Sequence, residues 1–233
     1  MLKGYFAAVT AMDLDVGRLL DKLEEKGIRD DTLVVFTSDN GFSCGHHGFW
    51  GKGNGTYPLN MYENSVRIPF IASQPGRIPG GSCVDALCSA IDFMPSLIDY
   101  VGLDLPVDLT LPGHTFAPLL TGSGAGERET IVVYDEYGPT RMVRTADWKY
   151  VRRHPGGPDE LWDLVNDPDE RANRIDDPGQ RSRIRDMQMH LNDWFASHAR
   201  PEKDGLNLPV SGGGQLRPVG GKWEDGSKSF VEN

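Results

Sequence analysis

The chain has 233 residues, 38 % of them hydrophobic, and 24 basic against 34 acidic residues give it a net charge of −10. This length suits one large domain or two small ones, and the negative charge argues against nucleic acid and anionic membrane surfaces as partners. No apolar stretch approaches the roughly 18–20 residues that cross a bilayer, and the three cysteines form neither a disulfide framework nor a C-x-x-C metal motif.

Residues 4–26 show a pattern typical of one long amphipathic helix. Apolar residues recur at steps of three and four, and charged residues fill the other face. Gly27 follows where a glycine commonly ends a helix. A weak signal peptide over residues 4–12 is the alternative interpretation. Because the chain opens inside this helix, we expect it to be part of a longer protein.

The next elements predict an α/β arrangement. The run Thr32–Thr37 is apolar without alternation, which indicates a strand buried on both faces. A helix leading into such a strand is half of a parallel α/β unit. A second apolar run covers residues 68–72, and helices are expected near residues 90–101 and 115–120.

The pattern changes after Gly122. Three short β-rich runs at residues 131–136, 140–145 and 148–153 follow one another at about nine-residue spacing, which favours an antiparallel meander. An apolar periodicity predicts a final helix near residues 180–197. We therefore expect an α/β domain over residues 1–122, a small antiparallel α+β subdomain over 123–200, and a glycine-rich tail over 201–233. That tail either folds over the site or forms a flexible arm.

Candidate metal ligands follow the first predicted strand directly. Asp39 and Asn40 are adjacent oxygen donors, a pair that suits a hard cation such as Ca²⁺ or Mg²⁺. The carboxyl end of a strand is also where open α/β sheets bind ligands. However, Asp-Asn-Gly is a common turn sequence, and two ligands are fewer than the roughly 6–8 oxygens that calcium prefers. The residues by themselves leave both interpretations open.

Two histidines and a lysine follow within the same segment. His46 and His47 suggest zinc, but adjacent histidines rarely bind one ion and no third ligand has convincing spacing. Lys52 lies in a glycine-rich loop in which it could approach an anion, or it is an ordinary surface lysine. The phosphate-loop pattern G-x-x-x-x-G-K-[S/T] is not met, so a nucleotide site is not supported.

Nine short segments of the chain follow one another in a characteristic order. They are Asp39–Gly41, Gly45–Gly48, Trp50–Lys52, Met61–Pro69, Pro75–Ile78, Asp92–Leu97, Leu111–Leu120, Arg144–Tyr150 and Glu160–Glu170. Taken together, these segments resemble the sulfatase family of the alkaline-phosphatase-like superfamily. The resemblance covers about residues 4–200 and implies that the chain is the carboxyl-terminal portion of a sulfatase, with residues 1–122 the later part of its mixed α/β domain.

This resemblance assigns roles to four residues. Asp39 and Asn40 would be calcium ligands, with magnesium as the alternative ion. Lys52 would bind a sulfate oxygen and offset the negative charge that develops in the reaction. His47 would line the pocket as a proton donor or a hydrogen-bond partner of the sulfate. Lys52 and His47 are thus the expected catalytic and substrate-binding residues.

Neighbouring residues receive structural roles from the same resemblance. His46 stands where relatives often carry Glu, which places it outside the site. Arg67 would brace its loop, and Trp50 and Trp162 would serve packing.

The nucleophile of the family is missing from the chain. In that family the nucleophile is a formylglycine, made by oxidation of the Cys or Ser of a C/S-x-P-x-R motif. This motif lies upstream of Asp-Asn-Gly, together with an early Asp-Asp pair that completes the calcium site. Only 38 residues precede Asp39, and no C/S-x-P-x-R motif lies among them. The Asp-Asp pair they contain, Asp30–Asp31, directly precedes the Thr32–Thr37 run and so does not correspond to the early pair of the family. Ser73–Arg77 fits S-x-P-x-R formally, but it lies downstream of the metal pair and is not expected to be the nucleophile. A chain without the nucleophile should be inactive alone.

Three functions follow as hypotheses. The first is calcium-assisted hydrolysis of a sulfate ester, on a small molecule or a sulfated glycan, completed by a missing N-terminal portion or a partner chain. The second is a non-catalytic sulfatase-like module that acts through a partner subunit. The third is a phosphodiesterase or phosphonate hydrolase of the same superfamily. Zinc-dependent relatives of that kind usually carry His where this chain has Asn40. The sequence is compatible with either a periplasmic or a cytoplasmic location.

Overall fold

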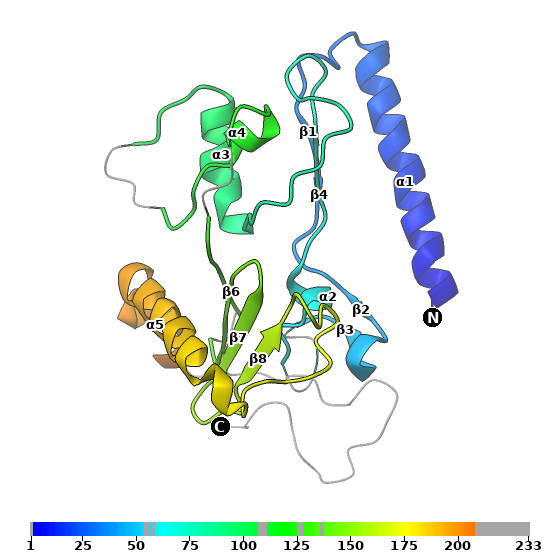
Figure 1. The fold of residues 1–233 in the computed structure, drawn as a ribbon. Coiled ribbons are helices and arrows are strands. Elements are labelled where there is room, and N and C mark those ends of the chain that lie inside the picture. Colours follow the sequence, from blue (N-terminus) through cyan, green and yellow to red (C-terminus); the bar gives the residue numbers. More distant parts are fainter. Residues whose placement is uncertain are drawn as a thin grey trace.

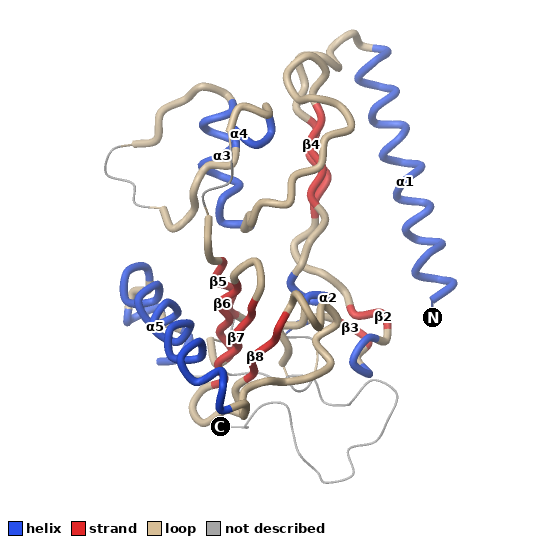
Figure 2. Tube along the Cα trace, viewed as in Figure 1, coloured by secondary structure: helices blue, strands red, loops and turns tan. Residues whose placement is uncertain are grey.

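The computed structural model describes residues 2–53, 56, 59–106, 111–124, 128–135 and 138–207. Strand pairing gives a two-stranded ribbon in one part and a four-stranded sheet in the other. Figures 1 and 2 show helices on both sides of the ribbon and a helix beside the sheet. Short elements between the two parts carry the candidate site. This arrangement agrees with the predicted combination of α/β elements and a small antiparallel α+β unit.

Helix α1 (Leu2–Glu25) confirms the predicted N-terminal helix. Its end is set by Gly27, which has φ +65°. The amide of Gly27 donates to the carbonyl of Glu24 and that of Ile28 donates to Leu23, the two bonds of a Schellman motif. No residue of α1 is buried. Its contact with the site region is a stack of Tyr5 on Phe42, with ring centroids 5.6 Å apart.

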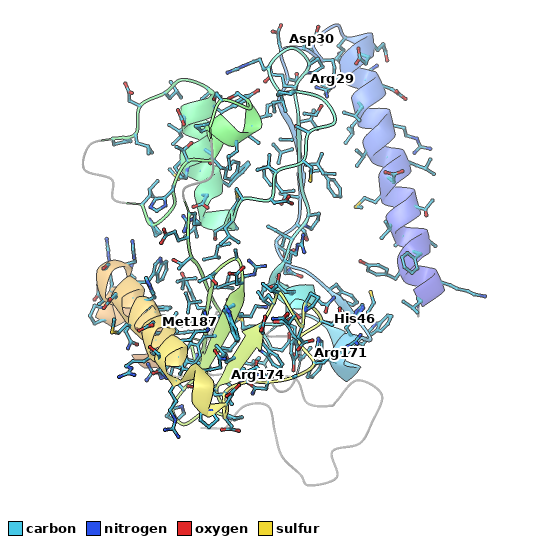
Figure 3. The ribbon with its side chains drawn as sticks, viewed as in Figure 1. Arg29, Asp30, His46, Arg171, Arg174 and Met187 are labelled. Atoms are coloured by element: carbon cyan, nitrogen blue, oxygen red, sulfur yellow. The ribbon has the colours of Figure 1, made fainter. Side chains whose placement is uncertain are left out.

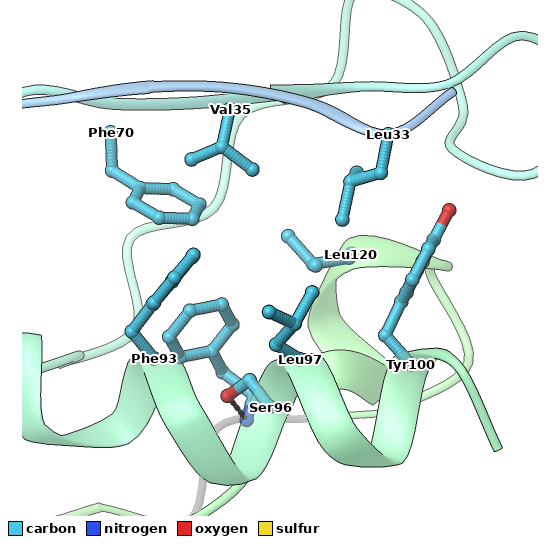
Figure 4. Close-up of a pocket in the computed structure, with 9 residues that line it drawn as sticks. Leu33, Val35, Phe70, Phe93, Ser96, Leu97, Tyr100 and Leu120 are labelled. Atoms are coloured by element: carbon cyan, nitrogen blue, oxygen red, sulfur yellow. Dashed lines mark hydrogen bonds between the residues drawn. The ribbon is translucent and has the colours of Figure 1, made fainter. Parts of the chain in front are cut away.

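Strands β1 (Val34–Thr37) and β4 (Phe70–Ser73) form the antiparallel ribbon, with Val34 opposite Ser73 and Thr37 opposite Phe70. Helices α3 (Phe93–Tyr100) and α4 (Ala117–Leu120) cover one face, after a 3₁₀ turn at Ala90–Asp92. Figure 4 shows the apolar side chains that meet there. They leave a cavity of about 10 Å³, which is at most the space of one water.

The opposite face of the ribbon corrects the expected environment of β1. Ile71, which lies on that face beside Phe36, is 61 % exposed, so the prediction of a strand buried on both faces is wrong for this chain. The expected parallel pairing also differs, because the partner of β1 within the described residues is the antiparallel β4. The physical reason is that the helices packed on this ribbon cover one face, while α1 stands apart from the other (Figure 1).

Short elements carry the predicted site residues. Strands β2 (Ser43–Cys44) and β3 (Trp50–Gly51) pair across a 3₁₀ turn at His46–Gly48. Helix α2 (Glu63–Val66) lies close to the loop that follows β1. The Gly41 amide donates to the Ser65 carbonyl at 2.9 Å, and a Cβ at Gly41 would lie 2.2 Å from the carbonyl oxygen of Asn64. Glycine is therefore required at this position by a close backbone approach.

The C-terminal sheet has the order β5-β6-β7-β8, with all neighbours antiparallel. Its strands are β5 (Ile131–Tyr134), β6 (Thr140–Arg144), β7 (Trp148–Arg153) and β8 (Glu160–Asp163). The meander prediction is confirmed for the first three, and β8 adds a fourth strand that the sequence pattern did not indicate. Helix α5 (Arg181–His198) confirms the last predicted helix.

Both faces of this sheet are packed. On one face, Tyr150 and Leu161 pack with Met187 and Leu191 of α5. On the other face, Met142, Val151 and Trp162 enclose Met61, which comes from the segment before α2. The packing role expected for Trp162 is confirmed. The segment around Met61, which leads into α2 beside the candidate site, is thus anchored in the core of the C-terminal sheet.

The remaining described segments are short. Single 3₁₀ turns occur at Pro178–Gln180, Pro201–Lys203 and Gly205–Asn207, and most of the predicted tail, residues 208–233, lies outside the described residues. Cys44, Cys83 and Cys88 are free thiols. Among the helices of the described segments, none has the length and hydropathy of a membrane span.

Candidate functional site

Asp39 and Lys52 lie together at the end of β1. The ammonium of Lys52 is 3.8 Å from Oδ2 of Asp39, and the two side chains are 43 % and 84 % exposed. The hydroxyl of Ser38 donates to the Asn40 carbonyl at 2.8 Å, which fixes the turn from which both predicted metal ligands project. Because both side chains are exposed, the charges of Asp39 and Lys52 are accessible to a ligand. An exposed ion pair of this kind contributes little to the stability of the fold.

The donor chemistry at this turn fits part of a hard-cation site. Asp39 supplies a carboxylate and Asn40 an amide oxygen, which are ligand types of Ca²⁺ and Mg²⁺. Within the part of the chain that the structure describes, no cluster of three or more His, Cys, Asp or Glu side chains could hold a metal. Among the described residues, this turn therefore offers the two oxygen donors of Asp39 and Asn40, and a calcium ion needs further ligands.

His47 makes its ring contact with Tyr62 rather than with the Asp39–Lys52 pair. The two rings are parallel within 2°, with centroids 3.7 Å apart, and His47 has a left-handed backbone with φ 54°. Partial burial, and secondly the charge of His46, lower the pKa of His47, while Asp169 and Asp167 act in the opposite direction. Its imidazole is therefore neutral at pH 7 and can donate or accept one hydrogen bond.

Of the predicted site residues, the structure brings Lys52 and Asp39 close together, whereas His47 lies apart from both. Lys52 meets Asp39, but among the described residues no hydrogen bond or ion pair joins His47 to either of them. His46 is exposed, while His47 is half-buried on Tyr62. The zinc interpretation of the two histidines therefore gains no ligand set from the described residues. Trp50 packs edge-on against Phe42 at 5.9 Å, as its structural role implies.

Ser73 lies at the far end of the ribbon from the site. It pairs with Val34 at the start of β1, whereas Asp39 follows Thr37 at the other end. At about 3.3 Å per residue, the three steps from Val34 to Thr37 span roughly 10 Å, and Asp39 lies beyond the Thr37 end. The Ser73 hydroxyl is bound by Arg29 at 2.6 Å, and Figure 3 shows Arg29 at the opposite end of the ribbon from His46. The formal S-x-P-x-R match is thus outside the site, as expected.

A buried ionic cluster beside Tyr62 was missed by the sequence reasoning. Lys149 of β7, with 0 % of its side chain exposed, lies 2.7 Å from Glu63 and 2.6 Å from Glu170, and Arg144 approaches Glu63 at 3.1 Å. Strand alternation offered a signal, because Lys149 shares a face with the buried Val151. A lysine at an inward position of a strand requires buried partners.

Comparison with known proteins finds a matching family model and similar curated proteins. Residues 1–103 match the family model described as Sulfatase. An N-acetylglucosamine-6-O-sulfatase of Bacteroides thetaiotaomicron is 33 % identical over 183 residues, covering 74 % of this chain and 31 % of that protein. A choline-sulfatase of Rhizobium meliloti is 33 % identical over 179 residues, covering 76 % of this chain and 33 % of that protein. The chain thus spans about a third of the length of these curated relatives.

The chain is also similar to parts of solved structures. A protein in complex with its substrate D-glucosamine-2-N,6-O-disulfate superimposes with a TM-score of 0.72 at 29 % identity, covering 84 % of this chain and 41 % of that one. A phosphonate monoester hydrolase of Agrobacterium radiobacter gives a TM-score of 0.67 at 28 % identity, with 81 % and 40 % covered. The fold of this chain therefore matches a part of these hydrolases.

Proposed function

The chain belongs to the sulfatase family, with the α/β fold of the alkaline-phosphatase-like superfamily, and from this premise we propose that it carries the sulfate-binding part of a sulfate-ester hydrolase. The observation that supports this is the exposed Lys52 ammonium beside the Asp39 carboxylate. A lysine ammonium beside a partial metal site is suited to an anionic sulfate, because the sulfate can bind the ammonium and a metal ion at the same time.

The chemistry assigned to each residue follows from its charge. Lys52 binds a sulfate oxygen and stabilises the negative charge that develops as the ester bond breaks. The neutral ring of His47, favoured by its lowered pKa, donates a hydrogen bond to the sulfate, and only its protonated form could give a proton to the leaving group. Asp39 and Asn40 would supply two ligands to a calcium ion, and that ion would add positive charge beside the sulfate. The formylglycine nucleophile and the remaining ligands come from polypeptide outside these 233 residues.

We propose a sulfated glycan as the substrate class. Two similar proteins support this proposal: the relative named as an N-acetylglucosamine-6-O-sulfatase and the structure holding a disulfated glucosamine. A sulfate ester on a sugar also offers hydroxyl groups that a polar, exposed site can bind through hydrogen bonds.

The first test is to read the DNA upstream of the Met1 codon. An in-frame extension that encodes an Asp-Asp pair and C/S-x-P-x-R would provide the protein to assay for sulfate release from glucosamine 6-sulfate. In that protein, Lys52→Ala should lower kcat/KM by about 10²–10³-fold, as expected for one group that stabilises developing charge. The control is Lys26→Ala, at an exposed position in the turn that follows α1. A nearby upstream stop codon, without such a motif, would contradict the proposal.

Two alternatives have specific support. Similarity to the phosphonate monoester hydrolase favours a phosphonate or phosphodiester substrate, which would show as faster turnover of an aryl phosphonate than of the matching aryl sulfate. The exposed Ile71 and the unburied α1 favour a non-catalytic module docked on a partner. For that module, Lys52→Ala would leave partner binding unchanged.

A further inference from the structure

The turn before α2 is held by the C-terminal sheet. Lys149 donates to the Met61 carbonyl at 2.9 Å and pairs with Glu63 and Glu170 at 2.7 and 2.6 Å. An ammonium has three protons, and each of them has an acceptor in this cluster. The Lys149 side chain is therefore fully satisfied, and two of its three partners belong to one segment, Met61–Glu63.

Glu170 performs the capping of α2 from a distant part of the chain. The residue at the N-cap, Tyr62, has no side-chain capping bond. Instead, Oε2 of Glu170 accepts the Glu63 amide at 2.6 Å, while its Oε1 binds Lys149. Negative charge at a helix N-terminus is favourable, so Glu170 and Lys149 together fix both the backbone and the side chain of Glu63.

The charges in this cluster balance only when Lys149 is present. Burial favours the neutral form of Glu63, but Lys149 and Arg144 outweigh it and hold the pKa of Glu63 below its usual value. For Glu170, burial outweighs the attraction of Lys149 and raises the pKa. Removing Lys149 would leave two buried carboxylates facing each other, with Arg144 as the remaining cation at Glu63.

The His47 ring and the turn that carries Asp39 and Asn40 both contact the same short segment, Tyr62–Ser65. The ring of Tyr62 stacks on His47 at 3.7 Å and packs against Trp162 at 5.7 Å. Three residues further on, the Ser65 carbonyl accepts the Gly41 amide and so fixes the turn of Asp39 and Asn40. A shift of α2 would therefore move His47 and the metal turn together.

We propose that Lys149 is a positioning residue for the candidate site: from the C-terminal sheet it locks the Tyr62–Glu63 segment, which in turn holds the His47 ring. The inference rests on the proposed function in taking His47 and Asp39 as site residues. The position of the His47 ring is measurable without turnover, so a failure of sulfate hydrolysis would not decide it.

The test is nuclear magnetic resonance of the histidine rings in the 233-residue chain. His47→Gln identifies the Cε1–Hε1 signal of His47, which the Tyr62 ring current should shift upfield. In Lys149→Met this signal should move downfield, toward the position of an unstacked histidine. Its titration midpoint should rise as well. However, loss of the Lys149 charge by itself contributes to that rise, and the midpoint also depends on His46, which lowers the pKa of His47, and on Asp167 and Asp169, which raise it. The chemical shift is therefore the decisive readout.

Controls separate positioning from loss of stability. Arg128→Met breaks a comparable buried pair, with Asp92, and should leave the His47 signal in place. Tyr62→Leu should reproduce the downfield shift, and Tyr62→Phe should not. If Lys149→Met does not fold, Lys149→Met/Glu170→Gln removes the uncompensated carboxylate. An unchanged His47 signal in the folded variant, or an equal shift in Arg128→Met, would overturn the proposal.

Discussion

The two parts of this molecule differ in how completely they bury their apolar surface. In the C-terminal sheet, Tyr150, Val151 and Leu161 are fully buried between α5 and the Met61 segment. In the N-terminal part, α1 has no buried residue and Leu19 is 68 % exposed. One part therefore has a core of its own, whereas the other presents apolar surface that a folded protein normally covers.

This contrast explains where the candidate site obtains its rigidity. The Asp39–Lys52 pair lies at the end of a ribbon with one uncovered face, but the neighbouring segment of Met61 and Tyr62 packs into the sheet core. A site on a partly uncovered ribbon can be held by a distant, well-packed sheet. The predictions that follow test this contrast, from the largest expected effect to the smallest.

Truncation of the sheet core should have the largest effect. Leu161→Ala should lower the free energy of unfolding by about 2–5 kcal/mol, because it opens a cavity among fully buried side chains. Leu19→Ala on exposed α1 should change it by no more than about 0.5 kcal/mol. Urea unfolding followed by tryptophan fluorescence measures both. Similar losses from the two variants would refute the contrast.

Two glycine substitutions within the N-terminal part should have opposite signs. Gly41→Ala places a Cβ against the Asn64 carbonyl and should cost about 1–3 kcal/mol, typical of overpacking. Gly17→Ala, with nothing within 4 Å of the added carbon, should stabilise α1 by up to about 1 kcal/mol through helix propensity. Thermal unfolding followed by circular dichroism provides the comparison. A neutral Gly41→Ala would show that the loop after β1 is not held against α2.

The pH dependence should be the smallest effect, with one histidine in each part. Partial burial comes first among the causes that lower the pKa of His154, followed by Arg152 and Arg141, and burial also lowers that of His47. A lowered pKa means that the unfolded chain binds more protons, so stability falls as pH drops below about 6.5. His154→Gln should weaken this fall in the unfolding transition of the sheet. An unchanged pH profile would exclude His154 as its source.

Local patterns predicted the elements well and their surroundings poorly. The three-and-four spacing of apolar residues before Gly27 predicted α1, and the nine-residue spacing after Gly122 predicted three strands of the meander. The environment of Thr32–Thr37 was wrong, because a continuous apolar run indicates burial without showing whether both faces are covered. Coverage is decided by packing between elements that are distant in the chain.

The sequence by itself determined the family, through an order of motifs that begins at Asp39–Gly41, and placed Lys52 near Asp39. The tertiary structure decided that His47 stacks on Tyr62 and that Lys149 lies between Glu63 and Glu170. In the same cluster, the Glu63 amide is bound by Glu170, 107 positions away in the chain. Spacing along the chain reports neighbours on one strand or helix, whereas the partners of a buried charge are set by the way the two parts pack together.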